Sequence, residues 1–159
     1  MCSKPERKSI TDDALSEGFT DLFARLMSKV ENNQSEKYDF SVRVCTLLAN
    51  VIGIENALSD YIYNLDTLPN VRQLFGDEIE YLQFYNEMNN ILSNELKQED
   101  LAKLYDDKVT LINKLKETIF IPFLQKDMQN KEEYINLFNN LFSEFQVTCD
   151  FSEIENVIK

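Results

Sequence analysis

The segment from residue 40 to residue 65 constrains the fold more than any other part of the sequence. Its apolar side chains recur at alternating steps of four and three residues, the spacing that keeps side chains on one face of an α-helix. These positions are Phe40, Val44, Leu47, Val51, Ile54, Leu58, Tyr61 and Leu65. A second row beside them consists of Cys45, Leu48, Ile52 and Ile62. The pattern predicts one helix, roughly 38 Å long at about 1.5 Å per residue, which tolerates Gly53 and is surrounded by other helices.

Helical spacing also governs the rest of the chain, and no stretch alternates with the period of two that is typical of strands. The chain has only three glycines and three prolines, too few for the many tight turns of an all-β fold. Caps and breaks are predicted at Thr11, Ser35 or Asp39, Pro69, Asp77, Asp100, Pro122, Asn130, and Asp150 or Ser152. After Asp77, the predicted buried face holds Ile79, Leu82, Tyr85, Met88, Ile91 and Leu92, with Tyr81 and Phe84 beside it.

The expected fold is therefore all-α, a single-domain bundle of five or six helices around a central apolar helix at about residues 40–65. Residues 1–10 are polar and are expected to form a flexible N-terminal tail. Residues 11–159 are expected to form a single helical domain, because a chain of 159 residues has the usual size of one domain.

Cysteine usage and the lack of long apolar runs predict a cytoplasmic protein. Cys2, Cys45 and Cys149 are odd in number and widely spaced, which argues against a disulfide framework and favours a reducing compartment. The longest purely apolar run, residues 119–121, is far too short to span a bilayer. Acidic residues follow the basic N-terminus where a signal peptide needs an apolar segment.

The charge is strongly negative and unevenly distributed. The formal net charge is −12, and residues 55–107 account for most of it, with twelve acidic and three basic side chains. Such a chain is repelled by nucleic-acid phosphates and by anionic membranes, and it is attracted to basic protein surfaces. The acids expected to contact a basic partner are Glu78, Glu80, Glu87, Glu95, Asp100, Asp106 and Asp107.

The residue inventory limits the possible chemistry. The chain has no histidine, so it cannot supply a Ser-His-Asp or Cys-His arrangement or a histidine-ligated zinc. Its isolated glycines cannot form a phosphate-cradling loop, and no cofactor or metal is expected. Asp77-x-x-Glu80 resembles one of the acidic pairs of the all-helical, Mg²⁺-dependent MazG-like nucleotide pyrophosphohydrolases, but their second pair, E-x-x-D, is missing here.

These observations favour a non-catalytic protein–protein interaction module that presents an acidic helical surface to a basic protein. Three alternatives stay open. The chain could be a phage or viral inhibitor of a host defence protein that mimics nucleic acid. It could be a MazG-like pyrophosphohydrolase, as the resemblance implies. It could also be a helical subunit of a larger assembly that binds through an apolar patch. The sequence predicts no oligomeric state.

Overall fold

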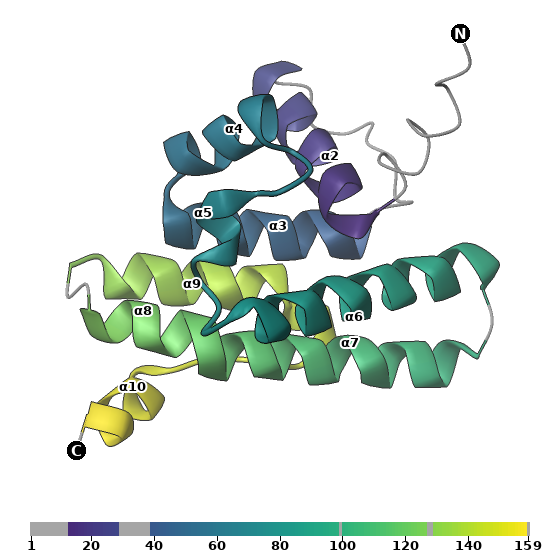
Figure 1. The fold of residues 1–159 in the computed structure, drawn as a ribbon. Coiled ribbons are helices and arrows are strands. Elements are labelled where there is room, and N and C mark those ends of the chain that lie inside the picture. The colour runs from purple at the N-terminus through teal and green to yellow at the C-terminus, as the bar shows by residue number, and fades with distance from the viewer. Residues whose placement is uncertain (1–12, 29–38, 99, 127–128, 159) are drawn as a thin grey trace, which may run out of the picture. The chain divides into compact units, whose positions relative to one another are not determined.

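The computed structural model describes residues 13–28, 39–98, 100–126 and 129–158 (Figure 1). Within these ranges the regular secondary structure is helical throughout and no strand occurs, so the prediction of an all-α fold is confirmed. The chain divides into two compact units, residues 1–98 and 99–159. The single helical domain expected for residues 11–159 stays a prediction, and the expected tail at residues 1–10 lies outside the described residues.

The first unit is built around a close contact between two helices. Its elements are α2 (Ala14–Ser28), α3 (Asp39–Ile52), α4 (Ile54–Tyr63), α5 (Pro69–Arg72) and α6 (Glu78–Lys97). A Cβ atom built on Gly18 of α2 would lie 2.7 Å from both the carbonyl oxygen of Ser41 and the Sγ atom of Cys45 on α3. The missing side chain of Gly18 therefore lets the two backbones approach closely, around the buried Phe19 and Leu15.

The predicted continuous helix over residues 40–65 is wrong, because the chain bends at Gly53. Gly53 adopts a φ of 98° and a ψ of 133°, and the axes of α3 and α4 differ in direction by 116°. Only glycine adopts this backbone conformation readily, and the spacing of apolar residues carries no information about a single backbone dihedral. The apolar row is buried along α3, as expected, but Ile54 and Ile62 of α4 are exposed.

A buried carboxylate joins α4 to α5. Asp60 on α4 is only 1% exposed. It accepts hydrogen bonds from the backbone nitrogens of Asn70 (2.9 Å) and Val71 (3.2 Å) and from Asn70 Nδ2 (2.8 Å). Asp60 thus satisfies N–H groups at the start of α5 that have no partner within that short helix, and so it fixes the position of the turn between the two helices.

Helix α6 begins as predicted and buries most of the predicted face, with a difference in its first two turns. The side chain of Asp77 accepts a hydrogen bond from the backbone nitrogen of Glu80 at 2.9 Å, which confirms Asp77 as the cap. The buried residues are Tyr81, Phe84, Met88, Ile91 and Leu92. Ile79 and Leu82, predicted to be buried, are 66% and 43% exposed. The aromatic pair takes their place because Phe75 packs against the rings of Tyr81 (centroids 5.6 Å apart) and Phe84 (4.9 Å).

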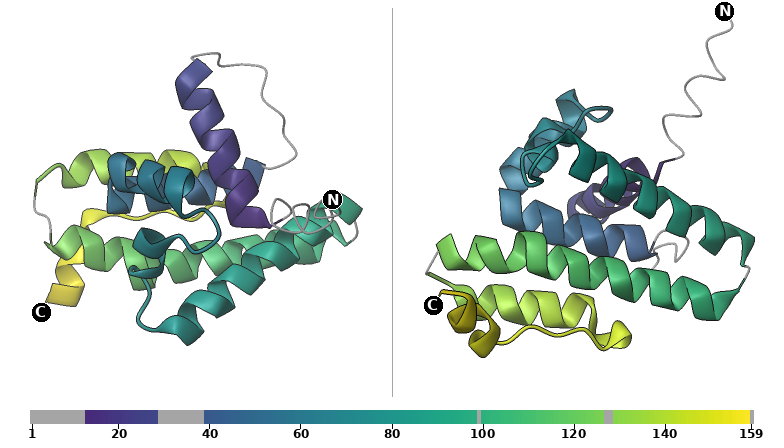
Figure 2. Two further views of the ribbon diagram at one scale, coloured as in Figure 1. Left: turned by 45° about the horizontal axis from the view of Figure 1, so that its top comes forward. Right: turned by 60° about the horizontal axis from the view of Figure 1, so that its bottom comes forward.

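In the second unit, three consecutive helical segments follow one another without a gap, and the last of them contains Pro122. These segments, together called the rod, are α7 (Leu101–Leu115), the π-helical segment η1 (Lys116–Phe120) and α8 (Ile121–Lys126) (Figure 2). Pro122 was predicted to break or kink this helix, and the irregularity is the π-helical turn just before it. There the backbone nitrogen of Ile121 donates to the carbonyl oxygen of Lys116, five residues earlier. Pro122 itself lies in the first turn of α8, where its missing N–H is tolerated.

Aromatic contacts attach α9 (Lys131–Leu141) to this rod. The ring of Phe138 stacks on Phe120 with centroids 4.7 Å apart, and the ring of Phe123 meets Tyr134 edge-on at 4.9 Å. A 3-10 turn, η2 (Ser143–Phe145), follows α9. An extended segment then leads to α10 (Phe151–Ile158). Phe138 and Tyr134 therefore form the face through which α9 contacts η1 and α8.

The structure shows the state of two cysteines and the length of the apolar helices. Cys45 and Cys149 are both free and buried, while Cys2 lies outside the described residues. Among the described helices, none alone has both the length and the apolar content needed to cross a membrane. The strongly bent pair α3 and α4 meets that requirement only when its two helices are taken together, on length and composition alone.

Candidate functional site

The seven acids predicted to bind a partner are divided between the two units. Glu78, Glu80, Glu87 and Glu95 lie on α6 in the first unit. Asp100 precedes α7 in the second unit, and Asp106 and Asp107 lie near the middle of that helix. Glu78 and Glu80 share the first turn of α6, but side chains at i,i+1 and i,i+2 of a helix do not face each other, so neither this pair nor Asp106 and Asp107 is brought together by the structure.

The first turn of α6 exposes three carboxylates next to one arginine. Asp77, Glu78 and Glu80 are all exposed, in line with the preference of acids for the positive end of the helix dipole. The Asp77 side chain caps the helix, and Glu80 Oε1 accepts a hydrogen bond from the backbone nitrogen of Gly76 at 2.9 Å. The Asp77-x-x-Glu80 pair therefore bonds to the helix backbone.

Arg72 is the basic member of this group. Its Nη1 atom lies 2.5 Å from Glu78 Oε2, and this hydrogen bond raises the pKa of the guanidinium. The guanidinium carbon lies 4.4 Å from the centroid of the Tyr81 ring, a cation–π contact. Arg72 thus neutralises one of the three charges, which leaves Asp77 and Glu80 as the uncompensated pair at this end of α6.

Glu87 and Glu95 occupy a different environment farther along α6. Both side chains are half-buried, and one carboxylate oxygen of each is shielded from solvent. At about 100° per residue their positions flank the buried face of the helix. Less of their charge therefore faces solvent than at Glu78 and Glu80.

In the second unit, Asp100 and Asp107 of the predicted acids make local contacts on α7. Asp100 caps α7 by accepting a hydrogen bond from the backbone nitrogen of Lys103 at 3.1 Å, as the sequence predicted. Lys103 Nζ lies 3.0 Å from Asp107 Oδ2, and this contact raises the pKa of the lysine. Asp106 is exposed to solvent.

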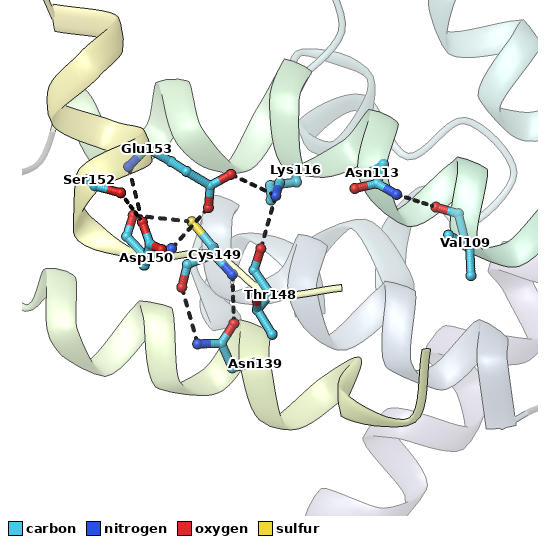
Figure 3. A network of polar contacts seen from close by, with 9 residues as sticks. All are labelled: Val109, Asn113, Lys116, Asn139, Thr148, Cys149, Asp150, Ser152 and Glu153. Atoms are coloured by element: carbon cyan, nitrogen blue, oxygen red, sulfur yellow. Dashed lines mark hydrogen bonds and ion pairs between the residues drawn. The ribbon is translucent and has the colours of Figure 1, made fainter. Parts of the chain in front are cut away.

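A polar groove of about 390 Å³ in the second unit was not foreseen. Its polar lining consists of Asn113, Lys116, Gln146, Thr148, Asp150 and Glu153. Lys116 is only 8% exposed, and its ammonium donates to the Thr148 carbonyl oxygen and to Glu153 Oε2, both at 2.9 Å (Figure 3). A buried ammonium requires such partners, because an isolated buried charge is very costly.

Reciprocal capping at the start of α10 orients the carboxylate of Glu153. Glu153 Oε1 accepts a hydrogen bond from the backbone nitrogen of Asp150 (3.0 Å), and Asp150 Oδ1 accepts one from the backbone nitrogen of Glu153 (3.1 Å). Asp150 also accepts a hydrogen bond from Ser152 Oγ at 2.6 Å, which lowers the pKa of Asp150. Of the two predicted caps for this helix, Asp150 is the one that acts.

An asparagine holds the chain next to this network. Asn139 on α9 accepts from the backbone nitrogen of Cys149 at 2.8 Å and donates to its carbonyl oxygen at 3.2 Å (Figure 3). The Cys149 thiol beneath is shielded from solvent, and burial raises its pKa to about 11. In this state the thiol is protonated at neutral pH and unreactive.

One feature of the sequence points to this site, namely the position of Lys116. Lys116 falls four residues after Ile112 and three before Ile119, so it lies on the apolar face of its helix. A lysine at such a position requires a carboxylate or carbonyl partner elsewhere in the fold. Its actual partners, Thr148 and Glu153, are more than thirty residues away, and no local pattern identifies them.

The described side chains form no group of three or more acids or cysteines that could hold a metal ion. The exposed acids of α6 and α7 can attract a basic group, and the polar side chains that line the groove can form hydrogen bonds with a ligand. No family model, no curated protein and no solved structure matches this chain.

Proposed function

We propose that this protein is a non-catalytic, cytoplasmic interaction module that presents an acidic helical surface to a basic partner protein. The observation that carries the proposal is the exposed group Asp77, Glu78 and Glu80, in a stretch where acids greatly outnumber bases. Residues 55–98, which end the first unit, contain eight acidic and only two basic side chains. Asp100 and Asp106 extend the same character into the second unit.

Charge of this kind acts mainly on encounter rate and on the choice of partner. A basic protein approaching α6 would meet the carboxylates of Asp77 and Glu80, which Arg72 does not neutralise, at the positive end of the helix dipole. Because exposed charges are screened over about 8–10 Å at physiological ionic strength, such binding weakens as salt is raised. The proposal therefore requires a salt-dependent affinity.

The test compares two double variants of equal charge. Glu80→Gln with Asp106→Asn removes two of the proposed contact charges, whereas Glu132→Gln with Glu133→Gln removes two exposed charges from α9. Proteins captured from native cytoplasm by the wild type should also be captured by the α9 variant, but not by the first variant. They should elute as salt is raised. Equal capture by both variants, or elution independent of salt, would refute the proposal.

The same capture decides whether the surface imitates nucleic acid. If it does, the captured protein is itself a nucleic-acid binder, and duplex DNA displaces it from the immobilised chain. Persistence of the complex in excess duplex would exclude mimicry while leaving the acidic-surface proposal intact.

A second candidate function, a subunit of a larger assembly, is favoured by exposed apolar side chains in the first unit. Met27 on α2 and Tyr63 on α4 are each 77% exposed. The rings of Phe23 and Tyr61 lie 5.3 Å apart, which brings these two helix ends together. Assembly with another chain would remove these side chains from water.

The two candidates respond differently to substitution. If these apolar side chains bind the partner, Met27→Lys and Tyr63→Asp abolish capture, while the acidic variants do not. In that case the complex also survives high salt, because apolar contacts are not weakened by screening.

A further inference from the structure

The C-terminal part of the second unit differs from the rest in how it is attached. Residues 146–154, here called the C-terminal strap, begin with Gln146 in the left-handed conformation (φ 60°) after η2. They continue through an extended stretch into the first turn of α10. In an extended chain alternate side chains face the same side. Accordingly Val147 and Cys149 are buried, while Thr148 and Asp150 face solvent.

Three side chains of neighbouring elements fasten the strap by hydrogen bonds. Lys116 donates to the Thr148 carbonyl and to Glu153, and Asn139 makes two hydrogen bonds to the backbone of Cys149. Gln125 Nε2 donates to the carbonyl oxygen of Ile154 at 3.4 Å. Every one of these bonds uses a side chain of η1, α8 or α9. The strap therefore does not depend on a shared backbone ladder, unlike a strand in a sheet.

We propose that the C-terminal strap is a releasable element, which detaches from the second unit while α7, α8 and α9 stay folded. Lys116 controls its release, because the Lys116 ammonium holds the strap at two points, residues 148 and 153. Release exposes the buried side chains of Val147, Cys149 and Ile154 to solvent. The Cys149 thiol then becomes accessible to reagents.

Lys116→Met is the informative variant. Methionine keeps an apolar stem in the buried channel and removes the ammonium, and the remaining partner, Glu153, is 38% exposed and can be solvated by water. The variant thus removes the two hydrogen bonds from Lys116 to the strap, and it leaves no fully buried charge without a partner. Lys126→Met, on the exposed end of α8, makes the same change in net charge and serves as the matched control.

Two readouts on the full-length protein separate strap release from unfolding. The first is the rate of alkylation by iodoacetamide, resolved for each cysteine by mass spectrometry, with the buried Cys45 as a reporter of the first unit. The second is amide hydrogen exchange in the strap and in α7. In Lys116→Met, alkylation of Cys149 and exchange of residues 147–154 should rise about tenfold or more, the expected effect of losing a charged hydrogen bond. Cys45 and residues 104–115 of α7 should keep wild-type rates.

Two results would overturn the proposal. Faster exchange of α7 in proportion to the strap would mean that the second unit opens as a whole. Unchanged alkylation of Cys149 in Lys116→Met would mean that Lys116 does not fasten the strap. Asn139→Ala provides an independent check, since it removes the two hydrogen bonds to Cys149 and should accelerate the same residues without changing any charge. The Lys126→Met control should match the wild type.

Discussion

Replacing Gly18 by alanine tests the packing of the first unit most directly. In an ordinary helix this change is favourable by about 1 kcal/mol, because alanine has the higher helix propensity. Here the new methyl group would lie 2.7 Å from the carbonyl oxygen of Ser41 and 2.9 Å from its carbonyl carbon, whereas ordinary contact begins near 3.4 Å. Backbone atoms cannot rotate out of the way, so α2 and α3 must separate.

The expected net effect is a loss of about 2 kcal/mol in the free energy of unfolding, since overpacking of a core costs up to about 3 kcal/mol and the helix propensity returns about 1. With a denaturant slope of about 2 kcal/mol per molar urea, the midpoint falls by about 1 M. The assay is urea unfolding followed by circular dichroism and by alkylation of Cys45, which reports on this unit.

Gly76→Ala is the matched control. A Cβ atom there would meet only the carboxylate end of Glu80, at 2.9 Å, and that flexible side chain can move aside. Its unfolding midpoint should stay close to that of the wild type. If Gly18→Ala were as stable as the wild type or more so, helix propensity alone would explain the position, and the close approach of α2 and α3 would be refuted.

Three further predictions concern other buried groups and the bend. Asp60→Ala should lower the free energy of unfolding by about 3 kcal/mol, measured by urea titration, because the backbone nitrogens of Asn70 and Val71 lose their acceptor; a change below 1 kcal/mol would contradict this. Gly53→Ala should cost about 1–3 kcal/mol in the same assay, since alanine disfavours a φ of 98°, and equal stability would show that the bend does not need glycine. Burial raises the pKa of Tyr81 to about 12 from an ordinary value of 10. The folded state therefore retains a proton that the unfolded state loses, and the contribution of Tyr81 to stability is full below pH 10 and is lost as the pH rises toward 12. Burial also raises the pKa of Tyr85. Absorbance titration at alkaline pH should therefore show a late-ionising fraction of the tyrosines that loses its step near pH 12 in Tyr81→Phe, and an unchanged late step in that variant would refute the assignment.

The sequence predicted what depends on neighbouring residues. The helix starts at Asp77, Asp100 and Asp150 were all anticipated, because a capping side chain bonds to a nitrogen only three residues away. The all-α class followed from the same kind of local information, namely the helical period of the apolar residues and the scarcity of glycine and proline.

Features that depend on distant contacts or on one dihedral were not predictable. The bend at Gly53 leaves the apolar period unchanged, so the pattern could not reveal it. The first two turns of α6 bury Tyr81 and Phe84 rather than Ile79 and Leu82, and both aromatic rings contact Phe75, which lies outside that helix. The partners of Lys116 come from the far end of the unit. The acidic positions were found by composition, but composition could not show that Glu87 and Glu95 are half-buried.

The π-helical turn before Pro122 has a consequence for tolerance to length changes. A hydrogen bond over five residues rather than four accommodates one extra residue in the turn, so the residues on either side keep nearly the same helical phase. Shortening residues 116–120 by one would therefore return this turn to ordinary α-helical bonding, while α8 keeps its direction and Phe123 its contact with Tyr134. The single surplus residue is absorbed within one turn, and its loss should leave the direction in which α8 presents its aromatic ring to α9 unchanged.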